Sequence, residues 1–137
     1  LKREEEIKEG FYMAQKLNDI TGEIVDCAYK IHKTMGPGLY EKVYEDCFAY
    51  ELEKKGLLFN RQHPITVHYE ELVIPSAFKI DLLVADTVVV ELKSTDKIHP
   101  IHQAQILTYL KLAKLQVGLL INFNVPLIKD GIKRFHV

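Results

Sequence analysis

The sequence has little net charge, little cysteine and no long apolar run, and each absence excludes a class of protein. The formal net charge of the 137 residues is −1, so the chain lacks the basic surface that usually accompanies tight, non-specific binding to nucleic acid. No apolar run reaches the roughly 18 residues of a membrane span. No signal-peptide pattern is present either, so we expect a cytoplasmic protein with no membrane partner. The two cysteines, Cys27 and Cys47, lie among apolar positions of predicted helices, which favours buried free thiols over a disulfide.

The remaining composition is that of an ordinary globular domain. Hydrophobic residues make up 47% of the chain and charged residues 27%, which suits one folded unit with its own core. The sequence contains no internal repeat, low-complexity tract or linker. We therefore predict a single domain over residues 1–137, in which residues 1–17 form an accessory N-terminal helix.

Hydrophobic spacing predicts the other elements in the order helix, helix, three strands, helix, strand, strand. Thr21 is the predicted N-cap of the first of these helices, which stops at the Gly-Pro-Gly sequence of residues 36–38. His32 beside its apolar face is interpreted as a structural or surface histidine. This order predicts an α/β fold, a mixed sheet with helices on both faces. The remaining elements are predicted at 39–55 (helix), 59–69, two strands within 78–93, 101–115 (helix), 117–123 and 132–137.

The stretch FKIDLLVADTVVVELK, residues 78–93, places charged side chains among the apolar residues of two predicted strands. Alternation puts Glu91 and Lys93 on one face. Asp81 joins them only if the hairpin loop is odd, because directly paired residues point to the same side of a sheet. A three-residue loop at 85–87 lacks the usual glycine but pairs Asp81 with Glu91, whereas a two-residue loop separates them. We predict the three-residue loop.

Two carboxylates and one ammonium group on a single patch suit phosphodiester hydrolysis. Carboxylate oxygens are ligands for Mg²⁺, and a bound divalent ion lowers the pKa of water and neutralises charge on a phosphodiester. Lys93 could position or deprotonate the attacking water, or stabilise developing negative charge. The simpler interpretation is an ion pair between Glu91 and Lys93, with Asp81 unrelated. Burying such charges within apolar strands is costly unless they are paired or bind metal, which favours a site.

The helix at 39–55 offers further carboxylates. On a helical wheel, Glu41 falls at the border of the apolar face and Glu45 lies just outside it. A carboxylate placed there can reach into a neighbouring site, although a glutamate in the first turn is also favoured by the helix dipole. On the residues alone the two interpretations of Glu41 are balanced. Gln62, on the following strand, is interpreted as a solvent-facing polar residue.

The helix at 101–115 carries an amide on its predicted apolar face. A buried amide without a partner costs about 1–3 kcal/mol, so Gln105 is either a satisfied structural residue or one that orients water at a site. Tyr109 lies beside this face. His99 and His102 are close in sequence but separated by a proline, and we do not interpret them as a metal-binding pair. The predicted face consists of Ile101, Gln105, Thr108 and Leu112.

Several stretches of the chain resemble a known group of proteins. Asp81, followed ten residues later by Glu91-Leu92-Lys93 and then by Gln105-x-x-x-Tyr109, resembles the PD-(D/E)XK nuclease superfamily and its RecB-like branch. Over residues 18–137, TGEIVDCAYKIHKTMGPGLYEKVYEDCFAYEL, FKIDLLV…VVVELK and GLLINFNVPLIKDGIKR resemble the small GxxExxR proteins of that superfamily. Two positions depart from the pattern, with Ile80 in place of the proline and Tyr44 in place of the arginine.

The resemblance implies a restriction-endonuclease-like αβββαβ core and a Mg²⁺- or Mn²⁺-dependent nuclease that hydrolyses phosphodiester bonds in DNA or RNA. The implied metal ligands are Asp81, Glu91 and Glu41, with Glu45 in reserve, and Lys93 would activate water. Gln105 and Tyr109 would orient these groups. The implied catalytic set is therefore Glu41, Asp81, Glu91, Lys93, Gln105 and Tyr109.

Other functions compete with this one. A non-catalytic nuclease-fold module that binds nucleic acid or a protein partner is favoured by the small size, the near-zero net charge and the lack of a target-reading domain. The complete set of acids with lysine favours the enzyme. Metal storage or transport has only unspecific histidine and acid content in its support. One site per chain and two strands to cut are consistent with a homodimer.

Overall fold

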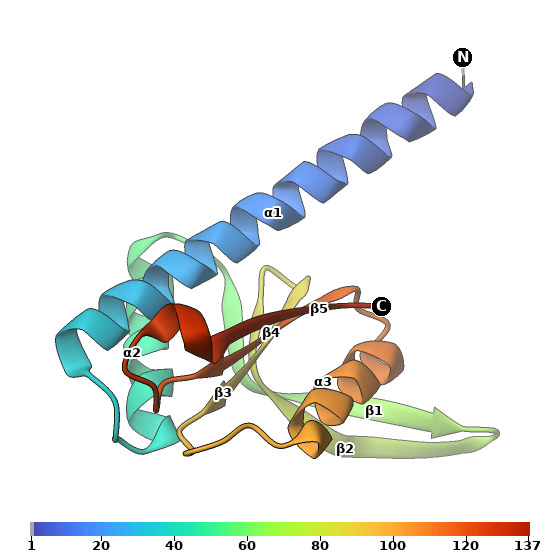
Figure 1. Ribbon diagram of the computed structural model, residues 1–137. Helices are drawn as coiled ribbons and strands as arrows, with labels where there is room; N and C mark the ends of the chain where they lie inside the picture. Colours follow the sequence, from blue (N-terminus) through green and yellow to red (C-terminus); the bar gives the residue numbers. More distant parts are fainter. Residues whose placement is uncertain (1) are drawn as a thin grey trace.

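The computed structural model describes residues 2–137, apart from the side chains of residues 11–14, so the predicted accessory helix lies within it except for residue 1 and these side chains (Figure 1). One sheet contains the five strands, β1 (Phe59–Tyr69), β2 (Leu72–Val84), β3 (Val88–Lys93), β4 (Val117–Asn122) and β5 (Ile132–His136), in this order. Strands β3 and β4 are parallel, and the other neighbours are antiparallel. The predicted α/β fold with a mixed sheet is confirmed. Along the chain the elements are α1 (Lys2–Met35), α2 (Glu41–Lys54), β1, β2, β3, α3 (Pro100–Ala113), β4, the 3-10 helix η1 (Ile128–Gly131) and β5.

A hydrophobic core lies on each face of the sheet. Helices α1 and α2 cover one face, where Phe48 and Val90 belong to the larger core. Helix α3 covers the other face through Ile106 and Leu110, which pack in the smaller core with Val89 (Figure 1). Every residue of β4 is buried, as expected for an apolar strand that is covered on both faces.

Helix α1 is one continuous helix of 34 residues, so the predicted break before Thr21 is wrong. Thr21 is buried, and its hydroxyl donates to the carbonyl of Asn18 at 3.0 Å, within the helix. The break is absent because Leu17, Ile20 and Ile24 continue one core-facing stripe across it. Towards its N-terminus the helix runs away from the sheet, and residues 2–10 are exposed (Figure 1).

Tyr44 holds the loop between α1 and α2. Its ring is fully buried and stacks on Phe123 with centroids 4.1 Å apart. Its hydroxyl donates to the carbonyl of Gly36 at 2.6 Å and accepts from the backbone N–H of Leu39 at 3.1 Å. The loop therefore ends in a fixed position before Glu41, where α2 begins.

The β2–β3 hairpin has the predicted odd loop. Val84 pairs with Val88, so Ala85, Asp86 and Thr87 form the loop. Ala85 and Asp86 take positive φ angles of 52° and 56°, which supply the left-handed turn that glycine usually provides. The predicted register of the two strands is confirmed.

The β1–β2 hairpin is longer than predicted, because β2 begins at Leu72 rather than near Phe78. β1 is an edge strand of the sheet, as Pro64 within it suggested. The pairing register shifts between Ile65 and Val67, which bends the ribbon as a bulge does. The tip of the hairpin extends beyond the helices (Figure 1).

Cys27 and His32 have the structural roles that were expected of them, whereas Cys47 is less buried than expected. Cys27 is a buried free thiol, and burial raises its pKa to about 11. Cys47 is also free but only partly buried. His32 is buried with its Nε2 atom 2.8 Å from the carbonyl oxygen of Val125. Among the described helices, none is both long and apolar enough to cross a bilayer.

Candidate active site

Asp81 and Glu91 lie where the β2–β3 ladder ends. Leu82 pairs with Val90, and beyond this pair the side chain of each acid accepts a hydrogen bond from the backbone of the neighbouring strand. The backbone N–H of Asp81 donates to Glu91 Oε1 at 3.1 Å, and the N–H of Leu92 donates to Asp81 Oδ2 at 2.9 Å. Each carboxylate takes the place of a ladder carbonyl, so the neighbouring strand holds it in position.

The regular alternation of β2 breaks at Asp81. Ile80 belongs to the core under α3 and Leu82 to the core under α1 and α2, although residues two apart in a regular strand share a face. Opposite Asp81, Gln62 takes a positive φ of 46°, and the β1–β2 ladder skips this pair. Because of this backbone irregularity, the side chains of Asp81 and Gln62 do not follow the regular alternation of their strands.

A hollow of about 470 Å³ opens beside this irregularity. Within it, Gln62 Nε2 donates to Glu45 Oε1 at 2.5 Å and to Asp81 Oδ1 at 3.3 Å. The amide of Gln62 therefore links a carboxylate of α2 to a carboxylate of β2. Gln62 is exposed, as interpreted, but its contacts with both carboxylates were not expected, and nothing in the hydrophobic pattern marks its left-handed backbone. The lining residues are Glu41, Lys42, Glu45, Gln62, Asp81 and Leu92.

The structure brings Glu45, rather than Glu41, towards Asp81. Glu45 is 9% exposed, whereas Glu41 is exposed at the rim of the hollow. Arg61 donates to Glu45 Oε2 through Nε at 3.0 Å and Nη2 at 2.8 Å. Strand β1 supplies these donors one turn after the start of α2, which is why the second glutamate is held and the first is not. Because Arg61 and Gln62 already engage both oxygens, Glu45 has a structural role here.

The carboxyl group of Glu91 is the most perturbed acid of the site. It is 7% exposed, and its pKa is raised from the ordinary 4.5 to about 8. Burial is the largest cause, and the negative charge of Asp81 is the next. The hydrogen bond from the Asp81 backbone and the positive charge of Lys93 act in the opposite direction. A strongly perturbed acid beside a second acid is typical of functional sites.

Lys93 lies at the end of β3, two residues after Glu91, and is half-buried. Alternation puts both side chains on the face that α3 covers, together with Val89 of the smaller core. Its ammonium charge stabilises the ionised form of Glu91. The two acids and this lysine are thus gathered where the β2–β3 ladder ends.

Helix α3 brings Tyr109 but not Gln105 into the wall of the site. The ring of Tyr109 stacks on Phe78 with centroids 4.0 Å apart, and burial together with the charges of Glu91 and Asp81 raises its pKa. Gln105 is exposed, so the predicted buried face is wrong. The buried face instead carries Ile106 and Leu110. Gln105 lies one helical turn before Tyr109, and its side chain is exposed to solvent.

The donor set suits a divalent ion held by two carboxylates. No group of three potential metal ligands occurs among the described residues, so the predicted trio with Glu41 does not form. Asp81 and Glu91 are nevertheless hard oxygen donors whose mutual repulsion a cation would relieve. Mg²⁺ is commonly bound by one or two carboxylates, with water and substrate phosphate completing its shell. The residues present therefore fit Mg²⁺ or Mn²⁺.

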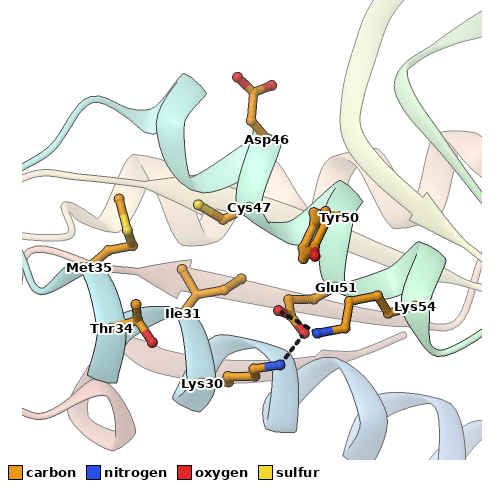
Figure 2. A pocket seen from close by; sticks show the side chains of 9 residues that line it. All are labelled: Lys30, Ile31, Thr34, Met35, Asp46, Cys47, Tyr50, Glu51 and Lys54. Atoms are coloured by element: carbon orange, nitrogen blue, oxygen red, sulfur yellow. Dashed lines mark hydrogen bonds and ion pairs between the residues drawn. The ribbon is translucent and has the colours of Figure 1, made fainter.

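A second hollow, of about 460 Å³, lies between α1 and α2, away from these acids (Figure 2). Glu51 crosses it, 3.0 Å from Lys30 and 3.7 Å from Lys54. Its remaining lining includes Ile31 and Met35. Exposed ion pairs of this kind contribute little energy, and we assign this groove no part in the site.

Comparison with known proteins identifies the chain by family. A model of the PD-(D/E)XK nuclease superfamily matches residues 18–135, most of the chain. No curated protein and no solved structure matches it. The matched range contains strands β1 to β4, β5 up to Phe135, the two site acids and Lys93. The chain belongs to the PD-(D/E)XK nuclease superfamily.

Proposed function

We propose that the protein is a Mg²⁺- or Mn²⁺-dependent nuclease that hydrolyses phosphodiester bonds in DNA or RNA. The observation that carries the proposal is the reciprocal pair of hydrogen bonds that fixes Asp81 and Glu91 at the end of the β2–β3 ladder. Beside this pair Lys93 is half-buried. Buried like charges are costly to maintain, and a metal-dependent site explains why a strand would carry them.

Each residue has a distinct part in this mechanism. Asp81 and Glu91 would hold the ion, which supplies charge neutralisation and acidification of water when it is bound. Lys93 would position the attacking water, or take its proton, and offset the negative charge that develops on the phosphate. Gln62 keeps Asp81 oriented through its amide, with Glu45 as its other partner.

The remaining predicted residues have lesser parts. Tyr109 would form a wall beside the acids, with its ring stacked on Phe78. Gln105, exposed one turn away, would contact bound nucleic acid rather than the acids. Glu41 would act from the rim of the hollow, towards substrate or an additional ion.

We further propose membership of the GxxExxR group within the superfamily. The support is the run from Gly38 to Glu41 and the strand sequences around Asp81. Tyr44 replaces the arginine of the group's label, and in this chain its hydroxyl holds the loop before α2. For a double-stranded substrate we propose a homodimer, since each chain offers one site.

The second candidate is a non-catalytic module that binds nucleic acid or a protein partner. The net charge of −1 favours it, because a nuclease that holds its substrate through phosphates usually carries a basic surface. The intact acids and Lys93 favour the enzyme, since a binding module gains nothing from a buried carboxyl with a second acid beside it.

The deciding experiment incubates the purified chain with labelled single- and double-stranded DNA and RNA, in millimolar Mn²⁺ or in EDTA. We expect cleavage only in Mn²⁺, and its loss in Lys93→Ala. The matched control is Lys79→Ala, which removes an exposed lysine of β2 and should cleave as the wild type does. Cleavage in EDTA, or equal cleavage by Lys93→Ala, would contradict the mechanism. Binding without cleavage of any substrate would establish the module instead.

A further inference from the structure

His102, in the first turn of α3, lies level with the end of β3. The helix connects two parallel strands, so it runs antiparallel to them. Ile106 packs on Gly118, because a Cβ atom added to Gly118 would lie 3.0 Å from Ile106 Cδ1. Gly118 in turn pairs with Val89 of β3. His102 precedes Ile106 by one turn, about 6 Å along the helix, which equals about two residues of strand. Two residues along β3 from Val89 is Glu91, and the strand continues to Lys93. His102 is therefore level with this end of β3.

The side chain of His102 also lies on the correct side of the sheet. Residues 102 and 106 share the face of α3 that packs on the sheet, and His102 is half-buried. Glu91 and Lys93 share the face of β3 that α3 covers. Burial lowers the pKa of His102, and the positive charge of Lys93 is the next cause, while Glu41 acts in the opposite direction. Lys93 and Glu41 are therefore among the charged groups that act on the imidazole.

A reciprocal pair of hydrogen bonds fixes which ring nitrogen of His102 carries the proton. The backbone N–H of His102 donates to the carbonyl of His99 at 2.9 Å. In return, the backbone N–H of His99 donates to His102 Nδ1 at 3.2 Å. Since Nδ1 must present a lone pair to this donor, the neutral ring carries its proton on Nε2. The hydrogen-bond donor of the neutral His102 side chain is therefore Nε2–H, and Nε2 is the ring nitrogen that does not accept from His99.

We infer that His102 is a substrate-binding residue of the nuclease site, whose Nε2–H donates to a non-bridging oxygen of the phosphodiester that is cleaved. The inference rests on the proposed function. A phosphate entering this site meets the acids Asp81 and Glu91, with Lys93 as the cation of β3. A second donor, delivered by the capped end of α3, supplies the orientation that a single flexible lysine does not.

The test compares His102→Phe, which keeps a ring but no donor, with His102→Gln, whose Nε2 can occupy the position of the lost donor. His99→Ala is the matched control, because it removes the neighbouring exposed imidazole but keeps the backbone N–H that caps His102. The measurements are Mn²⁺-dependent cleavage, affinity for a labelled oligonucleotide by fluorescence polarisation, and the melting temperature. A long-range ¹H–¹⁵N spectrum of the wild type reports the imidazole tautomer.

We expect His102→Phe to lose roughly tenfold or more in cleavage or affinity, as the loss of one good hydrogen bond predicts. His102→Gln should recover part of that loss, His99→Ala should match the wild type, and the spectrum should show an unprotonated Nδ1. Equal cleavage and affinity in wild type and His102→Phe, or a proton on Nδ1, would overturn the inference while leaving the nuclease intact. A wild type that binds but does not cleave would end the nuclease proposal, and the affinity of His102→Phe would then decide the inference. A wild type that does neither would overturn both.

Discussion

At the scale of single residues, Glu91 is the side chain that folding places in the least favourable surroundings. Its carboxyl is buried among apolar strands and next to Asp81, so its pKa is about 8 instead of 4.5. At a pH between these two pKa values, Glu91 keeps its proton in the folded chain and releases it in the unfolded chain. Raising the pH across this window therefore favours unfolding, because the folded state must either hold the proton or bury a charge.

The stability of the metal-free protein should consequently fall as the pH rises from about 5 to about 8. A single group with this displacement gives a slope of at most about 1.4 kcal/mol per pH unit. Glu91→Gln should remove most of the slope and be more stable than the wild type at the upper end, because the amide oxygen can still accept from Asp81. Urea unfolding in EDTA at several pH values measures the effect. Asp86→Asn, in the exposed loop of the same hairpin, is the control that should keep the slope. Parallel curves for wild type and Glu91→Gln would refute the assignment.

A divalent ion should reverse this penalty, since it replaces the proton that Glu91 otherwise keeps. A ligand that binds only the folded state stabilises it by about 2.7 kcal/mol at a hundredfold excess over its Kd. We expect the wild type to melt at a higher temperature in millimolar Mn²⁺ than in EDTA, and the difference to grow from pH 6 to pH 8. Asp81→Asn and Glu91→Gln should lose this response, whereas Glu41→Gln should keep most of it. If Glu41→Gln lost it as fully as Asp81→Asn, the ion would be held by three carboxylates after all.

At the scale of elements, parity reduced the pairing of β2 and β3 to a choice between an odd and an even loop. Asp81 and Glu91 are ten positions apart, so their direct pairing requires an odd loop, and the structure has the three-residue one. The kink at Asp81 and the left-handed Gln62 were not predictable, because they arise from contacts with Glu45 on another element. The sheet of the site thus follows from the sequence, while the hollow beside it depends on tertiary structure.

The helices show where local pattern is insufficient. In α3, apolar residues surround most of the helix, and Ile101 is 69% exposed while Ile106 is 1% exposed. Hydrophobicity therefore could not choose the buried face, and the predicted burial of Gln105 failed with it. In α1, Thr21 has the chemistry of an N-cap, but its hydroxyl bonds to Asn18 inside the helix. A threonine hydroxyl can either cap a helix or bond to a carbonyl of the preceding turn inside one. Packing of α1 on the sheet decides between these two positions for Thr21.

Helix α1 predicts an unusual effect for Gly22. Gly22 lies in the helix interior, is exposed, and has nothing within 4 Å of an added Cβ. Gly22→Ala should therefore raise the free energy of unfolding by about 0.5–1 kcal/mol. Gly38→Ala is the counterpart with the opposite sign, because Gly38 has a φ of +93° that alanine adopts only with strain. Chemical denaturation of both variants checks the pair. A neutral or destabilising Gly22→Ala would mean that the helix is interrupted near this residue.

The loop between α1 and α2 predicts a specific role for Tyr44. Tyr44→Phe keeps the stack on Phe123 but leaves the carbonyl of Gly36 and the N–H of Leu39 without their partner. An unsatisfied buried group costs about 1–3 kcal/mol, so we expect a loss of that order in the free energy of unfolding. Tyr50→Phe, on the exposed side of the same helix, should change it by less than about 0.5 kcal/mol. Equal stabilities of the two variants would show that the hydroxyl does not hold the loop.

At the scale of the whole molecule, charge distribution separates this chain from most nucleic-acid-binding proteins. Its net charge is −1, and its candidate site contains two acids and a single lysine on the paired strands. Long-range attraction to a phosphate backbone is therefore weak. We therefore expect any affinity for nucleic acid to come from the site itself, with a bound divalent ion as the main source of positive charge.

This balance predicts how binding responds to salt and to metal. Lys93→Ala keeps both carboxylates and is expected not to cleave, so its binding to a labelled oligonucleotide can be measured in Mn²⁺. We expect weak binding in EDTA, a gain of about tenfold or more in millimolar Mn²⁺, and a loss of less than about tenfold between 50 and 200 mM salt. A protein with six to ten phosphate contacts loses about a thousandfold or more over that range. The double variant with Asp81→Asn should lose the gain from Mn²⁺. Tight, metal-independent binding with a steep salt dependence would instead mean that a basic surface elsewhere on the chain holds the nucleic acid.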